Sequence, residues 1–226
     1  MTVAIIGAME EEIQYLKEHI NLERREEYNG DIFYFGSYCD KNIILTQSHV
    51  GMVAASSQLT SLANRFDFDL VINVGVCGGF SEKNNIFDII IGDKISCLDA
   101  DARHFGHYRY GQIPANPPYF QGNNDKINTE KTQIPFEYGD VLSSDKFVVS
   151  MKQIEYQLGH FDDFDVRCID MESAAFCQIA LKYHKDIVII RCISDLIGCK
   201  EQREMYDNLF TKAADKSSQF VLDILK

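Results

Sequence analysis

Apolar runs and amphipathic stretches alternate along the whole chain. The clearest run is Ile187–Ile190, where four consecutive β-branched residues predict a strand that is buried on both faces. Similar runs at Val3–Ile6 and Leu70–Val74 predict two more buried strands. An apolar stripe with helical spacing over Ile13–Ile20 and the Ala- and Ser-rich stretch Met52–Asn64 predict helices. Strands that alternate with helices favour an α/β fold.

The rest of the chain continues this alternation. Further strands are expected at Ile32–Tyr38, Asn42–Ser48, Ile86–Ile91, Asp93–Leu98, Tyr138–Leu142 and Asp165–Ile169, and further helices at Val148–Leu158, Ser173–Tyr183 and Arg203–Leu225. The segment Asp99–Phe120 carries aromatic and charged side chains and three of the four prolines, and we interpret it as a long ordered loop with a functional or interface role. No linker or change in composition divides the sequence. We therefore expect one domain over residues 1–226, in the α/β class, with a central mixed β-sheet flanked by helices.

The chain carries a formal net charge of −12, which repels phosphate backbones and anionic membrane surfaces. We therefore expect neither a nucleic-acid partner nor a membrane partner. No apolar run reaches the roughly 18–20 residues that a membrane span requires, and Met1–Gly7 leads directly into a strand without a basic leader. The seven cysteines form no CxxC pair, and no Cys/His group has zinc-ligand spacing. We expect reduced thiols in a cytoplasmic protein and no metal site.

Acidic residues recur where a predicted strand ends or the next helix begins. They are Glu10–Glu12, the pair Asp170 and Glu172, and Asp195; the glycine-rich segment Gly75–Gly79 follows a further strand and is expected to form a turn. Each acid taken alone is more typical of helix capping, which is worth ~0.3–1 kcal/mol. At the ends of parallel strands, these acids would together line one crevice, with no basic cluster to neutralise them. Such a site suits cleavage of a glycosidic bond, in which positive charge develops on the substrate.

Five motifs occur in the order of a known family. They are G-A-M-E-E-E at Gly7–Glu12, N-V-G-V-C-G-G at Asn73–Gly79, D-A-D-A and the later Y-G-Q-I-P within Asp99–Pro114, D-M-E at Asp170–Glu172, and R-C-I-S-D at Arg191–Asp195. With them the chain resembles, over nearly its whole length, the 5′-methylthioadenosine/S-adenosylhomocysteine nucleosidases of the nucleoside phosphorylase superfamily. The resemblance implies a nucleoside phosphorylase-like three-layer fold, a homodimer and no cofactor. It implies hydrolysis of the N-glycosidic bond of 5′-methylthioadenosine, S-adenosylhomocysteine and 5′-deoxyadenosine, with release of adenine.

The resemblance also implies roles for individual residues. Glu12 would activate the attacking water, and Asp195 would protonate adenine at N7 as the general acid. The implied substrate-binding residues are Met9, Val50 and Tyr206 around the 5′-alkylthio group, Met171 and Glu172 at the ribose, Arg191 near the water, Ser194 beside Asp195, Phe147 and Val148 at adenine, Val76 and Gly78 in the glycine-rich segment, and Phe105 with Pro114 reaching in from a neighbouring subunit.

One position departs from the family pattern, because Val76 stands where the family usually carries Ser. Loss of that hydroxyl would alter the positioning of water or make the site more apolar. Two alternatives stay open. A purine nucleoside phosphorylase would need cationic and hydroxyl groups to hold phosphate, and an acidic strand end repels phosphate. A non-catalytic nucleoside-binding protein on the same fold would not need Glu12 and Asp195 together.

Overall fold

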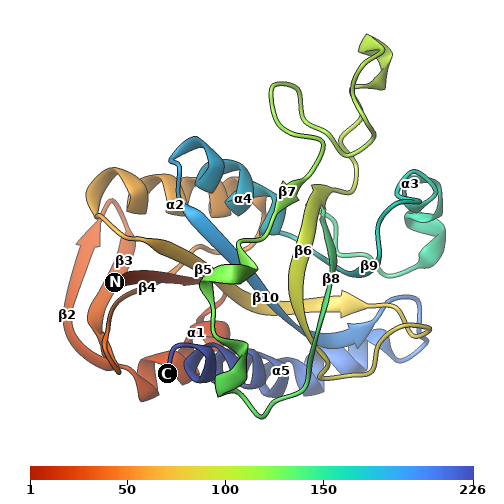
Figure 1. The fold of residues 1–226 in the computed structure, drawn as a ribbon. Coiled ribbons are helices and arrows are strands. Elements are labelled where there is room, and N and C mark those ends of the chain that lie inside the picture. The colour runs from red at the N-terminus through yellow and green to blue at the C-terminus, as the bar shows by residue number, and fades with distance from the viewer.

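The computed structural model describes residues 1–226, whose strands and helices form three layers (Figure 1). The strands are β1 (Thr2–Gly7), β2 (Asn21–Tyr28), β3 (Asp31–Tyr38), β4 (Lys41–Gln47), β5 (Leu70–Gly79), β6 (Ile89–Cys97), β7 (Phe120–Gln121), β8 (Phe136–Ser143), β9 (Val166–Asp170) and β10 (Asp186–Leu196). The α-helices are α1 (Glu10–His19), α2 (Met52–Arg65), α3 (Glu155–Leu158), α4 (Ser173–Lys182) and α5 (Gln202–Ile224). The prediction of an α/β protein with a mixed sheet flanked by helices is confirmed.

The strands belong to one ten-stranded mixed sheet that closes on itself over part of its width. β5 pairs in parallel with β1 and β10, β10 pairs antiparallel with β6, and β6, β8 and β9 run parallel to one another. The end of β9 then pairs antiparallel with the end of β5, where Ile169 lies opposite Gly78. This pairing closes a ring of β5, β10, β6, β8 and β9, and β1, β4, β3 and β2 extend the sheet outward.

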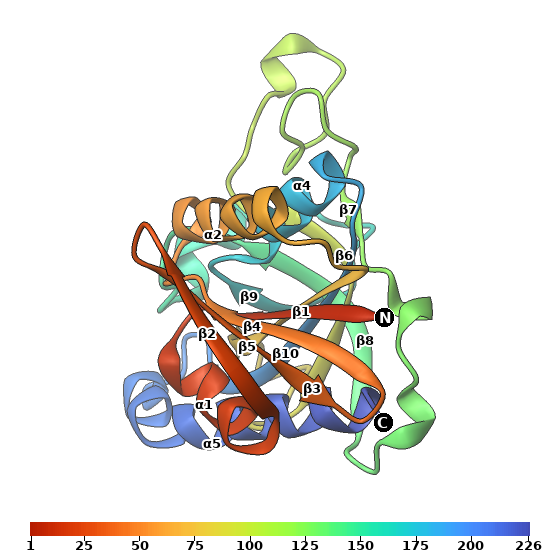
Figure 2. The same cartoon turned by 90° about the vertical axis from the view of Figure 1, so that its left-hand side faces the viewer.

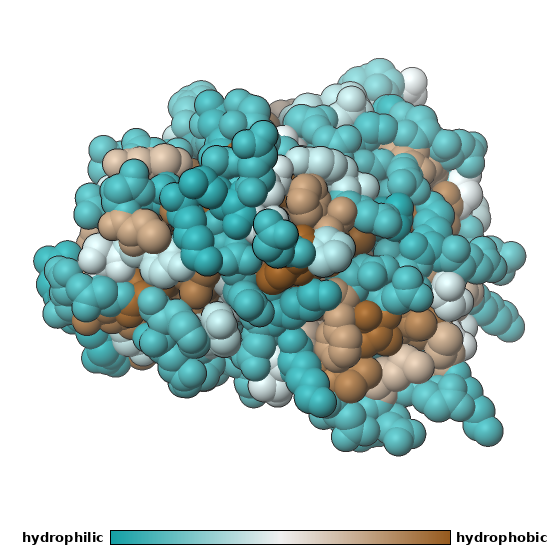
Figure 3. Space-filling view, turned by 60° about the horizontal axis from the view of Figure 1, so that its bottom comes forward, coloured by the Kyte–Doolittle hydropathy of each residue, from teal (hydrophilic) through white to brown (hydrophobic).

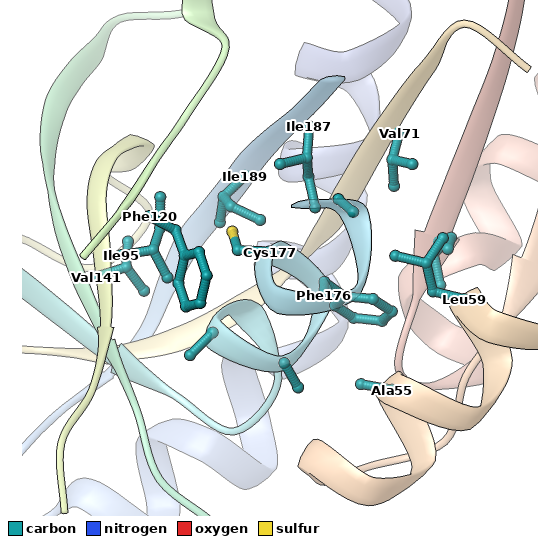
Figure 4. Packing of buried hydrophobic residues seen from close by; sticks show 14 of the residues in the cluster. Ala55, Leu59, Val71, Ile95, Phe120, Val141, Phe176, Cys177, Ile187 and Ile189 are labelled. Carbon is teal, nitrogen blue, oxygen red and sulfur yellow. The ribbon is translucent and has the colours of Figure 1, made fainter. Parts of the chain in front are cut away.

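Helices cover both faces of this sheet. In the two perpendicular views, α2 and α4 lie on one side and α1 and α5 on the other (Figures 1 and 2). Leu59 of α2 and Phe176 and Cys177 of α4 belong to the core on the first side, together with Val71 of β5 and Ile189 of β10 (Figure 4). A second core of apolar side chains from α1 and α5 covers the opposite face. The central strands are thus buried on both faces, which explains why their sequences are continuously apolar.

The segment between β6 and β7 projects from the body of the molecule (Figures 1 and 2). It contains a 3-10 turn at Arg103–Phe105 and an isolated bridge between Asp101 and Tyr110, and no longer helix or strand. The long ordered loop predicted for this part of the sequence is therefore present. On the face that carries α1 and α5, hydrophobic side chains gather in separate patches among polar ones (Figure 3). No helix combines the length and apolar character needed to cross a membrane.

Two expectations about the central strands were wrong. Gly75–Gly79 does not form a turn, because β5 continues through it and pairs with β10 almost residue by residue. Ile86–Ile91 and Asp93–Leu98 are not two strands joined at Gly92. A single strand, β6, passes through that glycine, and its register with β8 shifts immediately afterwards. In both places pairing with neighbouring strands overrides the local tendency of glycine to interrupt a strand.

Two other elements differ from the expectation. The helix predicted at Val148–Leu158 is reduced to a 3-10 turn at Met151–Gln153 and the short α3. Its first part is not helical, because the main chain at Val148 is bound to another part of the protein and Ser150 is extended and caps the 3-10 turn. Strand β2 was not predicted, since its largely exposed, charged sequence lacks an apolar run and it pairs only with β3 at the edge of the sheet.

Candidate active site

A cavity opens where β1, β5 and β10 end. The acidic residues in its lining are Glu12, Asp170, Glu172 and Asp195, and the one basic residue is Lys146. The rest of the wall consists of Ala8, Met9, Val50, Val76, Cys77, Gly78, Phe147, Val148, Ile169, Met171, Ser194, Ile197, Tyr206 and Phe210. The acidic crevice expected from the sequence is therefore present. Its strands are not all parallel, because β9 reaches the cavity antiparallel to β5 through the closed part of the sheet.

Glu12 lies in the first turn of α1, and main-chain N–H groups hold its carboxylate. Its Oε2 accepts hydrogen bonds from Ala8 (2.6 Å) and Met9 (3.1 Å), and its Oε1 accepts one from Val76 (2.9 Å). The bond from Met9 satisfies a free donor at the helix start, so the same carboxylate both caps the helix and faces the cavity. Burial raises the pKa of Glu12, and the positive charge of Arg191 and the three N–H donors oppose that rise.

β5 approaches this carboxylate closely because residue 75 has no side chain. A Cβ at Gly75 would lie 2.5 Å from Oε1 of Glu12, which is too close for a non-bonded contact. The glycine therefore lets the carboxylate reach the main chain of β5, where the N–H of Val76 meets it. The partly buried side chain of Val76 lines the cavity beside this bond.

Asp195 lies near the end of β10 and is 2% exposed, and neutral side chains hold it. Its Oδ1 accepts a hydrogen bond from Ser194 Oγ (2.8 Å), and its Oδ2 accepts one from Gln202 Nε2 (2.7 Å). Ser194 Oγ also lies 3.3 Å from the carbonyl oxygen of Cys77, so its single proton can serve either acceptor. Burial raises the pKa of Asp195, while the donors Gln202 and Ser194 lower it.

Glu172 immediately precedes α4 and connects it to α2. Its Oε1 accepts a hydrogen bond from the N–H of Gly51 (2.8 Å), a residue whose φ of 100° glycine adopts without strain. Burial, followed by the negative charge of Asp170, raises the pKa of Glu172 to about 8, although the charge of Arg191 opposes this shift. Glu172 is therefore largely protonated at neutral pH in this cavity.

Arg191 and Asp170 form an ion pair whose side chains are at most 2% exposed. Arg191 Nε donates to Asp170 Oδ2 (2.8 Å), and the guanidinium also donates to the side chains of Asn73 and Ser173. The pair joins β5, β9 and β10 and places a positive charge near the acidic wall. Arg191 itself lies behind the cavity and does not line it.

Two aromatic rings form an apolar part of the wall. Phe147 and Tyr206 meet edge to face with ring centroids 5.2 Å apart, and Phe147 is 47% exposed. The hydroxyl of Tyr206 donates to the sulfur of Met9 (3.9 Å), and Val50 lines the same cavity. Burial raises the pKa of Tyr206 to about 12, so its phenol stays neutral. This wall offers a flat base or an alkyl group a surface on which to pack.

The structure brings most of the residues singled out in the sequence into one place. Those that line the cavity are Met9, Glu12, Val50, Val76, Gly78, Phe147, Val148, Met171, Glu172, Ser194, Asp195 and Tyr206. Phe105 does not line it, because it lies in the 3-10 turn between β6 and β7 and is 67% exposed. The contact of Gln202 with Asp195 was not predicted. A polar residue at the start of a helix is common, and the sequence holds no signal that its side chain turns inward.

A model of the phosphorylase superfamily matches residues 2–226 of this chain. The 5′-methylthioadenosine/S-adenosylhomocysteine nucleosidase of Listeria monocytogenes is 34% identical over 237 residues, which cover 100% of this chain and 99% of that relative. Among solved structures, the Streptococcus pneumoniae nucleosidase of the same name, in complex with 8-aminoadenine, is similar with a TM-score of 0.92 at 29% identity, covering 100% of this chain and 99% of that one.

The nucleosidase of the same name from Neisseria meningitidis, in complex with methylthio-immucillin-A, has a TM-score of 0.90 at 30% identity, covering 100% of this chain and 98% of that one. The chain therefore belongs to the phosphorylase superfamily and, within it, to the family of 5′-methylthioadenosine/S-adenosylhomocysteine nucleosidases, which are hydrolases of N-glycosyl bonds.

Proposed function

We propose that this chain hydrolyses the N-glycosidic bond of 5′-methylthioadenosine and S-adenosylhomocysteine, and of 5′-deoxyadenosine, and releases adenine. Asp195 acts as the general acid at N7 of the base, and Glu12 activates the attacking water. The observation that carries the proposal is the pair of buried carboxyls, Glu12 and Asp195, in one cavity but with different hydrogen-bond partners. Two carboxyls in unlike environments are what the cleavage of a glycosidic bond requires.

The two environments support this division of roles. Fixed main-chain N–H groups occupy three acceptor positions of Glu12 and favour its ionised form, which leaves a position on Oε1 for the water. Asp195 is buried without a cationic partner and so keeps a proton more readily. Its neighbour Ser194 can donate its hydroxyl proton to Oδ1 of ionised Asp195. When Asp195 is protonated, Ser194 can turn that proton to the carbonyl oxygen of Cys77 and accept a hydrogen bond from Asp195 instead.

The remaining contacts follow from the shape of the wall. Phe147 packs against the base, and the main chain of Val148 binds its edge. Glu172 binds the ribose hydroxyls, with Met171 against the sugar, while Met9, Val50 and Tyr206 enclose the 5′-alkylthio group. Val76 and Gly78 complete the wall between the two carboxyls, and Arg191 acts from behind through its charge. These roles combine the positions of the side chains with the family membership of the chain.

The acidic wall argues against a phosphorylase that uses phosphate in place of water. Lys146 is the one cation among the lining residues, and its side chain is 66% exposed. Arg191 is already engaged by Asp170 and lies behind the wall. A phosphate ion in this cavity would therefore meet several carboxyls and no buried cation free to bind it.

We further propose that the chain is a homodimer in which the projecting segment, with Phe105 and Pro114, reaches the cavity of the neighbouring subunit. The position of Phe105 is compatible with this arrangement, since the residue is 67% exposed in the turn between β6 and β7 and is free to contact a second subunit. Sedimentation would give the mass of the particle. Phe105→Ala is expected to raise KM for 5′-methylthioadenosine; a monomer with an unchanged KM would contradict this proposal.

The decisive experiment measures adenine release from 5′-methylthioadenosine with and without inorganic phosphate. Wild-type protein is expected to turn over equally in both conditions, and strict dependence on phosphate would exclude hydrolysis. Asp195→Asn is expected to lose ~10²–10⁴-fold in kcat while keeping its thermal transition. Glu12→Gln should also be inactive but still bind 5′-methylthioadenosine. Near-normal turnover of either variant would remove that carboxyl from its role, and absence of turnover in the wild type would favour a binding protein.

A further inference from the structure

Gln202 is the first residue of α5, and its side-chain amide uses both of its donor positions and one of its two acceptor positions. Nε2 donates to Asp195 Oδ2 (2.7 Å) and to the carbonyl oxygen of Val148 (2.8 Å), and Oε1 accepts from the N–H of Gly198 (3.0 Å). The bonds to a main-chain carbonyl and a main-chain N–H fix which end of the amide is nitrogen and which is oxygen. The residue is 5% exposed, so water competes little for these bonds.

The amide approaches its two acceptors from outside the cavity. Val148 and Asp195 line the cavity, whereas Gln202 does not. One nitrogen thus holds a carboxyl from β10 and a carbonyl from the stretch after β8, and it fixes the spacing between them. Each of these oxygens has a second acceptor position, to which no other group of the protein donates.

Adenine presents two adjacent groups along one edge, the acceptor N7 and the donor amino group at C6. An acid that protonates N7 and a carbonyl that accepts from the amino group must therefore stand at a fixed spacing. We propose that Gln202 is a positioning residue that sets this spacing by holding Asp195 and the Val148 carbonyl from behind. This inference rests on the proposed function, because it takes Asp195 as the acid and Val148 as the contact of the base.

Replacement of the amide has an effect on pH dependence that a purely structural residue would not have. Gln202 and Ser194 are the two donors to Asp195, so removal of Gln202 disfavours the ionised carboxylate and raises the pKa of Asp195. Since Asp195 must be protonated to act, kcat/KM falls as the pH rises through that pKa. In the variant, the alkaline limb of the pH profile of kcat/KM therefore moves to higher pH. The other titratable or charged residues in the lining are Glu12, Cys77, Lys146, Asp170, Glu172 and Tyr206, with Arg191 behind it, and the substitutions leave all of them in place.

Two variants and one matched control test the proposal. Gln202→Met keeps the length of the side chain without a donor, and Gln202→Glu keeps its shape but turns the donor into an acceptor beside Asp195. Gln58→Met is the control, because Gln58 is also buried and donates through Nε2 to Thr46 (2.7 Å) in β4, but it does not line the cavity. It undergoes the same chemical change at a buried amide.

The measurements are kcat and KM for 5′-methylthioadenosine from pH 5 to 10, the Kd for free adenine by calorimetry, and the thermal transition. Gln202→Met is expected to lose roughly tenfold or more in kcat/KM, to bind adenine more weakly, and to move the alkaline limb up by about half a pH unit or more. Gln202→Glu should move it further in the same direction, because two neighbouring carboxyls share one proton. Gln58→Met should leave kcat/KM, the Kd for adenine and the alkaline limb unchanged, and should lower only the thermal transition.

The proposal is overturned if either folded Gln202 variant keeps the wild-type limb and the wild-type Kd for adenine, whatever its stability. Asp195→Asn, measured alongside, tells this failure from failure of the proposed function. If Asp195→Asn is inactive and the Gln202 variants are normal, the acid stands and Gln202 has no positioning role. If Asp195→Asn is active, the acid itself is wrong and the positioning role falls with it.

Discussion

Replacing Glu172 with Gln removes an ionisable carboxyl from the cavity and so measures how much its ionisation lowers the stability of the fold. The pKa of Glu172 is raised from 4.5 to about 8 in the folded chain. Because the folded-state pKa is raised, the stability that the protonated carboxyl contributes is complete below pH 4.5 and is lost as the pH rises toward 8. One pKa unit corresponds to about 1.4 kcal/mol, so by pH 7 the folded state has lost about 3 kcal/mol relative to its stability at low pH.

Glutamine has nearly the same shape, can still accept the bond from Gly51, and has no proton to lose. Glu172→Gln is therefore expected to exceed the wild type in stability by under about 1 kcal/mol at pH 5 and by about 3 kcal/mol at pH 7. For a chain of this size the latter raises Tm by roughly 6–12 °C. Thermal denaturation at pH 5, 7 and 8.5 measures the difference, with the exposed Glu82→Gln as a control that should show no such trend. A difference that does not grow with pH would falsify the raised pKa.

Three further outcomes are expected. Gly75→Ala should lower kcat roughly 10²-fold, because its Cβ displaces the carboxylate of Glu12; an adenine-release assay that finds wild-type kcat would contradict this placement. Asp170→Asn leaves Arg191 buried without its partner, so it should lower the free energy of unfolding, measured in urea, by about 3–5 kcal/mol. A loss of under about 1 kcal/mol would contradict that ion pair. Binding of 5′-methylthioadenosine to Asp195→Asn at pH 7 should release a large part of a proton, because ribose hydroxyls favour ionised Glu172. Calorimetry in buffers with different ionisation enthalpies detects this release, and its absence would contradict either the raised pKa or the ribose contact.

The fold was predictable where burial and sequence pattern coincide. The continuous apolar runs in β1, β5 and β10 identify strands that are covered on both faces, and the stripe of α1 identifies its buried side. The prediction failed at Gly75–Gly79 and at Gly92, where pairing with a neighbouring strand extends a strand through glycine. It also missed β2, whose pairing with β3 at the edge of the sheet demands no apolar residues. A strand partner that is distant in the sequence leaves no local pattern from which the pairing can be predicted.

The acids of the candidate site were predictable because each follows an apolar run, and strand ends gather at one edge of a sheet. How each acid is bound could not be predicted. The bonds from Val76 to Glu12 and from Gly51 to Glu172 join residues 64 and 121 positions apart. Gln202 stands only seven residues after Asp195, but nothing in a helix start indicates which way its amide turns. The chemistry of a side chain is visible in a sequence, whereas its partners depend on the closed sheet.

The electrostatics of the cavity link its cost in stability to its proposed chemistry. Its lining includes four acidic residues, and the one buried guanidinium, that of Arg191, is paired with one of them, Asp170. Burial therefore raises the pKa values of Glu12, Glu172 and Asp195 together, so ionisation of each carboxyl costs free energy in the folded chain that it does not cost in the unfolded chain. A substrate that develops positive charge lowers the free energy of every ionised carboxyl around it, whereas a neutral ground state does so far less. Under the proposed function, the burial of carboxyls without matching cations, which destabilises the ligand-free fold, thus favours an oxocarbenium-like transition state over the bound nucleoside.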